Sequence, residues 1–395
     1  MAVSRRVTGL VPGVGVASAD LEDGRIAAVE VLTPVPDEGW RDLAAGHPVL
    51  VPGLLDLQVN GYAGVDFSSP GLDPGVVRRV VEALWAEGVT GFCPTVITGP
   101  AAQMRESVAA LAAAARADEA VADALLGVHL EGPWISPVDG ARGAHPVEHV
   151  RPPDAGELAE LCAAGDVALL TIAPEIPGAT GLATAARERG VLVSVGHSLA
   201  EPEDVHAAVA AGATLSTHLG NGIPALLKRH PNLVWEQLGN DVLTAMFIAD
   251  GHHVDLATLR TMIRAKGAGR WFLVSDTTSV GGLAPGRYRT HIGGEVELDA
   301  AGRLGMIGTD YLAGAAASLR SGLANAWAAR VAEAAEVTAA VSARPAAVLG
   351  ERAFGRGGLD PGARADLLLG DWDEATGSLT VKETVVRGRT VWAAS

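Results

Sequence analysis

Residues 127–133 of the chain read Gly-Val-His-Leu-Glu-Gly-Pro, and this stretch decides the fold. An apolar run from Ala124 to Leu130 leads directly into the carboxylate of Glu131 and then into a Gly-Pro stop. A buried parallel strand ends in this way at its carboxyl edge, where a barrel of parallel strands carries its chemistry. Taken alone, Glu131 is more simply explained as an acid that caps the next helix, but other predicted strands end in the same way.

Strand and helix patterns alternate along most of the chain. Apolar stretches that predict buried strands occupy residues 49–57, 89–97, 125–131, 167–173, 191–197, 213–218, 243–250 and 271–276. Ala-rich helical patterns lie between them, for example at 204–211 and 256–266. Eight such units predict an α/β protein with a (β/α)8 TIM barrel. A doubly wound open sheet is the alternative, but it does not need eight strands, and no Gly-x-Gly-x-x-Gly motif follows any of them.

The two ends of the chain are rich in strand patterns instead. Residues 1–50 contain Asp23-Gly24 between apolar stretches, which predicts a hairpin, and residues 356–395 return to strands after the last helix. We expect both ends to pair into one small β-sandwich beside a catalytic barrel at residues 51–355. A further strand pattern at residues 280–308 predicts a β insertion after the eighth barrel strand.

Composition excludes several classes of partner. Hydrophobic residues make up 48% and charged residues 19% of the chain, as in globular proteins. The formal net charge of −16 disfavours nucleic acid and anionic membranes, although a local site can still bind a small anion. Only Cys93 and Cys162 are present, so we expect no disulfide framework and a cytoplasmic location. No signal peptide is expected, because Pro12 and three glycines interrupt residues 7–19. No apolar run reaches membrane-spanning length.

Four polar residues end predicted strands three, five, six and eight. They are Glu131, His197, His218 and Asp276, and the strand ends of a closed barrel face one another around its mouth. One carboxylate and two imidazoles suit a divalent metal such as zinc, with an open position for water. A zinc-bound water has a pKa of about 7. Asp276 is then placed to take the proton from that water and to pass it to a leaving nitrogen.

Each of these residues also has a simpler explanation. Ser198 and Glu201 after His197 fit a helix capping box, His218 fits a core histidine bonded to the backbone, and Asp276 fits a helix cap. Their joint position at strand ends favours the metal site over four separate structural roles.

Motifs spread over nearly the whole chain resemble one family. They are Gln58–Gly61, His129–Pro133, Gly196–Ser198, Thr217–Asn221, Ala249–Val254 and Val274–Asp276. In this order they are similar to the N-acetylglucosamine-6-phosphate deacetylases of the amidohydrolase superfamily, and residues 359–367 are typical of that superfamily. The resemblance implies a (β/α)8 barrel with a small β-sandwich, often as a homodimer. It also implies hydrolysis of a small phosphorylated amino sugar, N-acetylglucosamine 6-phosphate, to glucosamine 6-phosphate and acetate.

The resemblance also implies roles for individual residues. Glu131, His197 and His218 are expected to hold one divalent ion per chain, with Zn2+ favoured and Fe2+, Mn2+ or Co2+ as alternatives. Asp276 is expected to act as general base and then as general acid.

Further residues match the substrate side of the family's site. His145 matches a histidine that polarises the acetyl carbonyl, and the expected sugar and phosphate contacts are Asn221, Gly222, Arg229 and His253. In this family the arginine can reach a neighbouring subunit.

Strand one and the sugar pocket depart from common patterns. Gln58 and Asn60 stand where many amidohydrolases have His-x-His for a second ion, so a single metal is expected because amides are poor ligands beside imidazole. Gly222-Ile223 replaces the usual Ala-Met, His230-Pro231 replaces the usual Glu-Pro, and alanine replaces a common serine within residues 312–315. His252 is an additional histidine beside His253 and is equally well explained as a solvent-facing neighbour.

These departures leave the substrate open. The alternatives are a deacetylase of another acetamido sugar, such as N-acetylgalactosamine 6-phosphate or an unphosphorylated sugar, or another N-acyl amidohydrolase. A catalytically inactive scaffold is disfavoured, because all three expected ligands and the expected acid/base are present.

Overall fold

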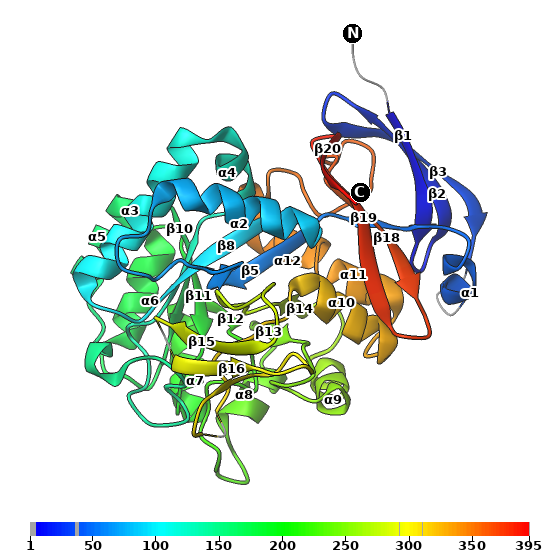
Figure 1. Ribbon diagram of the computed structural model, residues 1–395. Helices are drawn as coiled ribbons and strands as arrows, with labels where there is room; N and C mark the ends of the chain where they lie inside the picture. The colour runs from blue at the N-terminus through cyan, green and yellow to red at the C-terminus, as the bar shows by residue number, and fades with distance from the viewer. Residues whose placement is uncertain (1–4, 36–38, 292, 310, 395) are drawn as a thin grey trace.

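The computed structural model describes residues 5–35, 39–291, 293–309 and 311–394 (Figure 1). Its largest unit is an eight-stranded sheet in the order β14-β13-β12-β11-β10-β9-β8-β5. The strands are β5 (Leu54–Val59), β8 (Val89–Ile97), β9 (Val128–Glu131), β10 (Val167–Ile172), β11 (Leu192–Val195), β12 (Ala213–Ser216), β13 (Thr244–Ile248) and β14 (Trp271–Val274). All neighbours in this order are parallel.

The residues just after β14 close the sheet into a barrel. Val59 at the end of β5 pairs in parallel with Thr277, and the backbone N–H of Asp276 donates to the carbonyl of Gln58 at 3.0 Å. The predicted (β/α)8 barrel is thereby confirmed, and its strands are buried as a parallel sheet requires.

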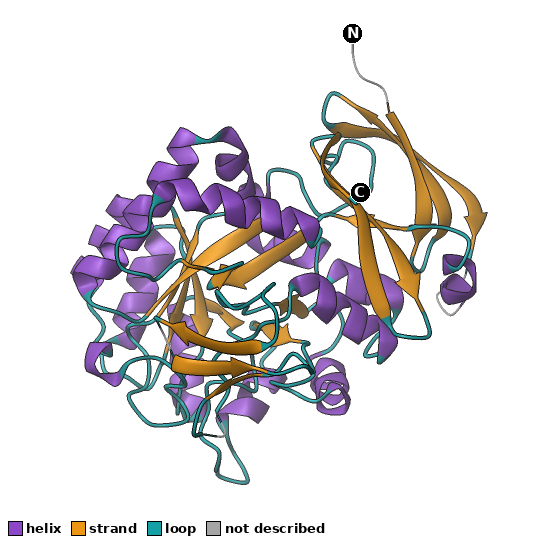
Figure 2. Cartoon of the chain, in the orientation of Figure 1, coloured by secondary structure: helices purple, strands orange, loops and turns teal. Residues whose placement is uncertain are grey.

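Helices surround the barrel (Figure 2). They are α2 (Pro74–Ala86), α3 (Ala101–Ala117), α4 (Glu119–Ala124), α5 (Ala155–Ala164), α6 (Ala179–Glu188), α7 (Pro202–Ala211), α8 (Leu233–Gly239), α9 (Leu256–Lys266), α10 (Leu319–Ala328), α11 (Ala334–Ala339) and α12 (Ala343–Leu349), with short 3₁₀ helices η2 (Val147–His149) and η3 (Gly350–Ala353). Asp118, Asp154 and Asp255 cap α4, α5 and α9 by accepting from first-turn N–H groups, which satisfies donors that a helix start leaves free. Within the described part of the chain, no helix combines the length and apolarity needed to cross a bilayer.

Both ends of the chain meet in a separate seven-stranded sheet, as predicted. Its order is β20-β19-β18-β4-β1-β2-β3, with strands β1 (Arg5–Val11), β2 (Gly15–Glu22), β3 (Arg25–Pro34), β4 (Val49–Pro52), β18 (Leu367–Asp373), β19 (Ser378–Val386) and β20 (Arg389–Ala393), and α1 (Trp40–Ala44) lies between β3 and β4. The predicted hairpin at Asp23-Gly24 joins β2 to β3, and both turn residues have positive φ, of 49° and 78°. Apolar residues of β1, β2, β4, β18 and β19 share one core that is distinct from the barrel core.

The strand predicted at residues 49–57 is divided between the two sheets. β4 pairs with β1 and β18, whereas β5 belongs to the barrel. Gly53 joins them at a close approach, since a Cβ on it would lie 2.3 Å from Thr90 Oγ1. A continuous apolar pattern cannot show where one buried strand ends and the next begins, which explains the difference.

Residues between β14 and α10 form a small three-stranded antiparallel sheet. It contains β15 (Gly286–Thr290), β16 (Gly294–Leu298) and β17 (Leu304–Met306). A two-stranded ribbon, β6 (Gly61–Tyr62) with β7 (Val65–Asp66), follows β5. Thr290 of β15 and Asp66 of β7 both line the cavity described below, so these additions form part of its wall.

A buried cluster of ion pairs joins the terminal sheet to the barrel. Arg356, whose side chain has 0% of its surface exposed, and Arg364 both donate to Asp366 at 2.9 Å. Arg364 also pairs with Asp123 of α4 in the barrel. Burial of Arg356 is tolerated only because these carboxylates face it, since an unpaired buried charge is very costly.

Replacement of one partner in this cluster is expected to destabilise the fold strongly. Asp366→Ala leaves Arg356 buried with a carboxylate missing, and the expected loss is about 3–5 kcal/mol in the free energy of unfolding. Asp371→Ala is the matched control, because Asp371 pairs with Lys382 while both side chains are about half exposed, and its expected effect is at most about 1 kcal/mol. Denaturant titration followed by tryptophan fluorescence measures both losses. Equal losses in the two variants would contradict a stabilising role for the buried cluster.

Candidate metal centre and active site

The residues singled out at strand ends converge in one cavity at the carboxyl edge of the barrel. The cavity has a volume of about 320 Å3. Its walls include Glu131, His145, His197, His218 and Asp276 together with Asn60, Asn221, Gly222 and His253. They come from the ends of different strands and from the loops that follow, as the barrel architecture allows.

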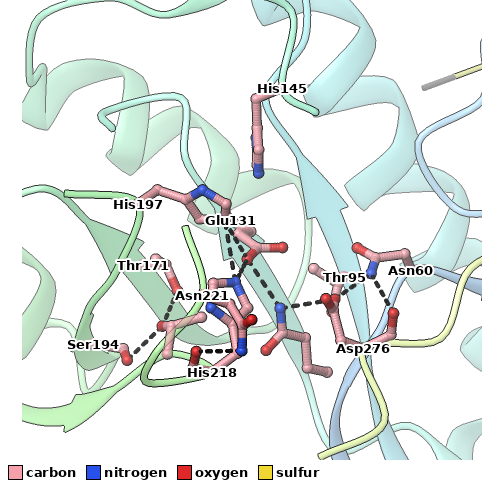
Figure 3. A network of polar contacts seen from close by, with 12 residues as sticks. Asn60, Thr95, Glu131, His145, Thr171, Ser194, His197, His218, Asn221 and Asp276 are labelled. Carbon is pink, nitrogen blue, oxygen red and sulfur yellow. Dashed lines mark hydrogen bonds and ion pairs between the residues drawn. The ribbon is translucent and has the colours of Figure 1, made fainter. Parts of the chain in front are cut away.

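Three ligand atoms meet at the centre of the cavity (Figure 3). Glu131 Oε1 lies 3.1 Å from His197 Nε2 and 2.9 Å from His218 Nε2. The two Nε2 atoms are 3.1 Å apart. Two bare imidazole nitrogens repel at this distance, so a proton or a cation is needed between them.

The donor set fits a divalent metal ion. His197 Nδ1 donates to the carbonyl of Ala141 at 2.9 Å, which leaves the Nε2 lone pair free for a cation. Ligands at about 2.0–2.2 Å from a tetrahedral zinc lie about 3.3 Å from one another, close to the observed separations. His145 also offers a ligand atom, because Glu131, His145 and His197 each place one within 4.8 Å of the others.

Burial and neighbouring charges shift the pKa values of the two carboxylates in opposite directions. Burial opposes ionisation of Glu131, but hydrogen bonds with His197 and His218 outweigh it and hold its pKa well below the usual value. Burial, and then the charge of Glu131, raise the pKa of Asp276 to about 6. Burial, with repulsion from His197, lowers the pKa of His145 well below its usual value, so His145 is neutral at pH 7.

Two amides contact these carboxylates, and that of Gln58 bridges them. Gln58 Nε2 donates to Glu131 Oε1 at 2.9 Å and to Asp276 Oδ1 at 3.0 Å. Asn60 Nδ2 donates to the same Asp276 oxygen at 2.7 Å. Their N–H groups therefore stabilise two close carboxylates.

Three site residues have a backbone conformation that is rare outside glycine. His197, His218 and Asp276 have φ of 50°, 28° and 53°, in the left-handed region. Each lies two residues beyond the end of its strand, after β11, β12 and β14. Such conformations cost about 1–3 kcal/mol each and persist only where the surrounding fold imposes them, which is common at functional sites.

The structure brings together all but one of the predicted site residues. The His145 and His197 rings are 4.4 Å apart, and His253 lines the cavity with its Nδ1 2.6 Å from Asp250 Oδ2. Gly222, with φ of 59°, lies so close to His197 that a Cβ would be 2.9 Å from Nδ1.

Arg229 is the exception, because it is exposed in the loop between β12 and α8 and does not line the cavity.

Other residues around the cavity were not found from the sequence. Asp66, Tyr311 and Thr98 are the main ones: the first two line the cavity, and Thr98 contacts His145. Thr98 directly follows β8, so the pattern of a polar residue at a strand end, which identified Glu131, also applies to Thr98. Asp66 and Tyr311 carry no such signal. His252 lies apart from the site, with its Nε2 3.1 Å from the carbonyl of Ala301.

Comparison with known proteins identifies the family. The model of the amidohydrolase family matches residues 49–391. The N-acetylglucosamine-6-phosphate deacetylase of Danio rerio is 34% identical, over 94% of this chain and 92% of that protein, and the human enzyme is 35% identical over 88% and 85%. The N-acetylgalactosamine-6-phosphate deacetylase of Escherichia coli O157:H7 is 31% identical over 89% of both chains.

Solved structures agree with this family. N-acetyl-D-glucosamine-6-phosphate deacetylase from Mycobacterium smegmatis has a TM-score of 0.85 at 28% identity and covers 98% of this chain and 100% of that one. An aspartate-to-alanine variant of that enzyme, in complex with N-acetyl-D-glucosamine-6-phosphate, has a TM-score of 0.84 at 28% identity and covers 98% and 99%. The chain therefore belongs to the amidohydrolase family and, within it, to the N-acetylglucosamine-6-phosphate deacetylases.

Proposed function

We propose that this protein hydrolyses the acetamide of N-acetylglucosamine 6-phosphate to glucosamine 6-phosphate and acetate. The observation that carries the proposal is the position of Asp276, with a pKa of about 6, beside the converging ligand atoms of Glu131, His197 and His218. The relatives from Danio rerio and Homo sapiens are named for this reaction, which supports the same activity here.

The chemistry follows from the groups around the cavity. Glu131, His197 and His218 would hold a divalent ion, which would supply Lewis acidity and lower the pKa of a water toward about 7. Asp276 accepts a proton from that water while the water oxygen bonds to the acetyl carbon. Asp276 then gives the proton to the nitrogen as the C–N bond breaks, so that acetate and a free amine leave.

Substrate recognition is proposed for the residues that face the same cavity. His145 is assigned to the acetyl oxygen, and Asn221 and the Gly222 backbone to the sugar, because all three line the cavity. His253 is assigned to the phosphate. Arg229 lies in the exposed loop that also carries Leu226, which is 91% exposed. We propose that Arg229 reaches the phosphate in the cavity of a second subunit, and that the protein is therefore a homodimer.

N-acetylgalactosamine 6-phosphate is a second candidate substrate, because one relative is named for its deacetylation. The relative from Escherichia coli O157:H7 is an N-acetylgalactosamine-6-phosphate deacetylase, which acts on the C4 epimer. An acetate-release assay with both phosphorylated sugars, and with their unphosphorylated forms, identifies the preferred one. We also propose a cytoplasmic location, since Cys93 and Cys162 are free thiols.

The proposed ligands predict about one divalent ion, most favourably zinc, per chain. His197→Ala removes a ligand, and both the ion and the activity are expected to be lost. Elemental analysis of the purified variants measures this loss. His252→Ala is the matched control, because His252 contacts the Ala301 carbonyl outside the centre, and this variant should retain the ion. Full occupancy in His197→Ala would refute the ligand assignment.

The proposed proton transfers predict a selective effect of Asp276→Asn. The amide keeps the shape of the side chain but cannot accept the proton, so kcat should fall by at least about 10²-fold, the range typical of general acid–base catalysis. Metal content and thermal stability should persist. Near-normal kcat would exclude Asp276 as the base, and loss of the ion together with activity would make it a ligand instead.

The proposed phosphate contact predicts a difference between two substrates. Arg229→Ala removes charge-assisted hydrogen bonds worth about 1.5–3 kcal/mol, so KM for the phosphorylated sugar should rise roughly 10- to 100-fold while KM for the unphosphorylated sugar changes little. The neighbouring Lys228, which pairs with Glu201 on the surface, provides the control Lys228→Ala with little change in either KM. An equal rise in both KM values for Arg229→Ala would argue against phosphate recognition by this residue.

A further inference from the structure

His145 can serve the site in two mutually exclusive ways, and its ring proton decides between them. With a bare Nε2 the ring is a candidate metal ligand, because it shares the ligand group with Glu131 and His197. With a protonated Nε2 the ring is a hydrogen-bond donor to the substrate. The tautomer of a neutral imidazole is fixed by the partner of its other nitrogen. The partner of Nδ1 is therefore the residue that matters.

That partner is Thr98, which directly follows β8. Its Oγ1 lies 2.9 Å from His145 Nδ1, and Thr98 and His145 are only 2% and 4% exposed. A second acceptor for the hydroxyl proton is the Glu131 carbonyl, at the long distance of 3.5 Å. That carbonyl already accepts the backbone N–H of Thr98 at 3.1 Å. The contact with Nδ1 is therefore the better geometry for the hydroxyl proton, with Nδ1 as the acceptor.

The main chain around the cavity preserves this contact. Gly132 has φ of 84°, and a Cβ on it would lie 2.2 Å from Thr98 Oγ1, so only glycine leaves room for the hydroxyl. On the other side, the guanidinium of Arg142 donates to the carbonyl of His145 and holds the loop that carries the ring. Two separate segments of the chain thus hold the Thr98 hydroxyl and the His145 ring in contact.

We propose that Thr98 is a positioning residue that donates its hydroxyl proton to His145 Nδ1 and so keeps the proton of His145 on Nε2. In this tautomer His145 is a donor aimed at the cavity and not a fourth metal ligand. The identity of the group that receives this hydrogen bond, the acetyl oxygen of the substrate, rests on the proposed function. A neutral imidazole N–H is a suitable donor for an oxygen on which negative charge develops.

The tautomer is measured directly in the zinc-loaded protein without substrate. Imidazole 15N NMR, with the His145 signals assigned by their loss in His145→Gln, should show a protonated Nε2 and a hydrogen-bonded, unprotonated Nδ1. Thr98→Ser keeps the hydroxyl and should preserve this pattern. Thr98→Val is nearly isosteric but lacks the hydroxyl, so the preference for the Nε2–H tautomer should be lost and the Nδ1 signal should shift toward that of a protonated nitrogen.

Steady-state kinetics of the same variants test whether this tautomer of His145 contributes to kcat. In Thr98→Val, kcat should fall roughly 10- to 100-fold, the range for a buried polar group that loses its partner, while KM and zinc content stay unchanged. Thr98→Ser should restore kcat. A protonated Nδ1 in the wild-type protein, or equal damage in Thr98→Val and Thr98→Ser, would overturn the proposal. Absence of acetate release from every acetamido sugar, with the expected NMR pattern, would reject the proposed function and still support the role of Thr98.

Discussion

The structure depends on the electrostatic balance of a few buried groups at the mouth of the barrel. Glu131 and Asp276 are carboxylates that are buried in one site, and an unpaired charge there would be very costly. The two imidazoles of His197 and His218 face Glu131, and the amide of Gln58 spans both carboxylates. The balance keeps Glu131 ionised and raises the pKa of Asp276 to about 6. One carboxylate is thus suited to hold a cation and the other to carry protons.

The barrel supplies the rigidity that this arrangement requires. His197, His218 and Asp276 each follow a buried strand in a left-handed backbone conformation, which an isolated loop would relax. Parallel pairing on both sides of β11 and β12 fixes where these turns begin. Glycines at 132 and 222 then allow other segments to approach the site closely. The stability of the strands therefore maintains a geometry that is locally unfavourable.

Parts of the molecule outside the barrel strands contribute to the cavity wall. The three-stranded insertion contributes Thr290 to the cavity wall, and the Tyr311 hydroxyl contacts Asp139 across the mouth. Gly222-Ile223 and residues 312–314, where the sequence departs from the family, line the same cavity. Selectivity among amino sugars can therefore change there while Glu131, His197, His218 and Asp276 stay in place.

The sequence by itself determined the barrel and the residues at its strand ends. Apolar runs followed by polar residues are local patterns, so they revealed where β9, β11, β12 and β14 lead into the site. The tertiary structure alone decided the division of residues 49–57 between two sheets, the exposed position of Arg229 and the contact between Thr98 and His145. Thr98 and His145 are 47 positions apart, and their contact depends on the path of a loop through space. Local patterns do not encode such paths, because they result from packing among distant segments.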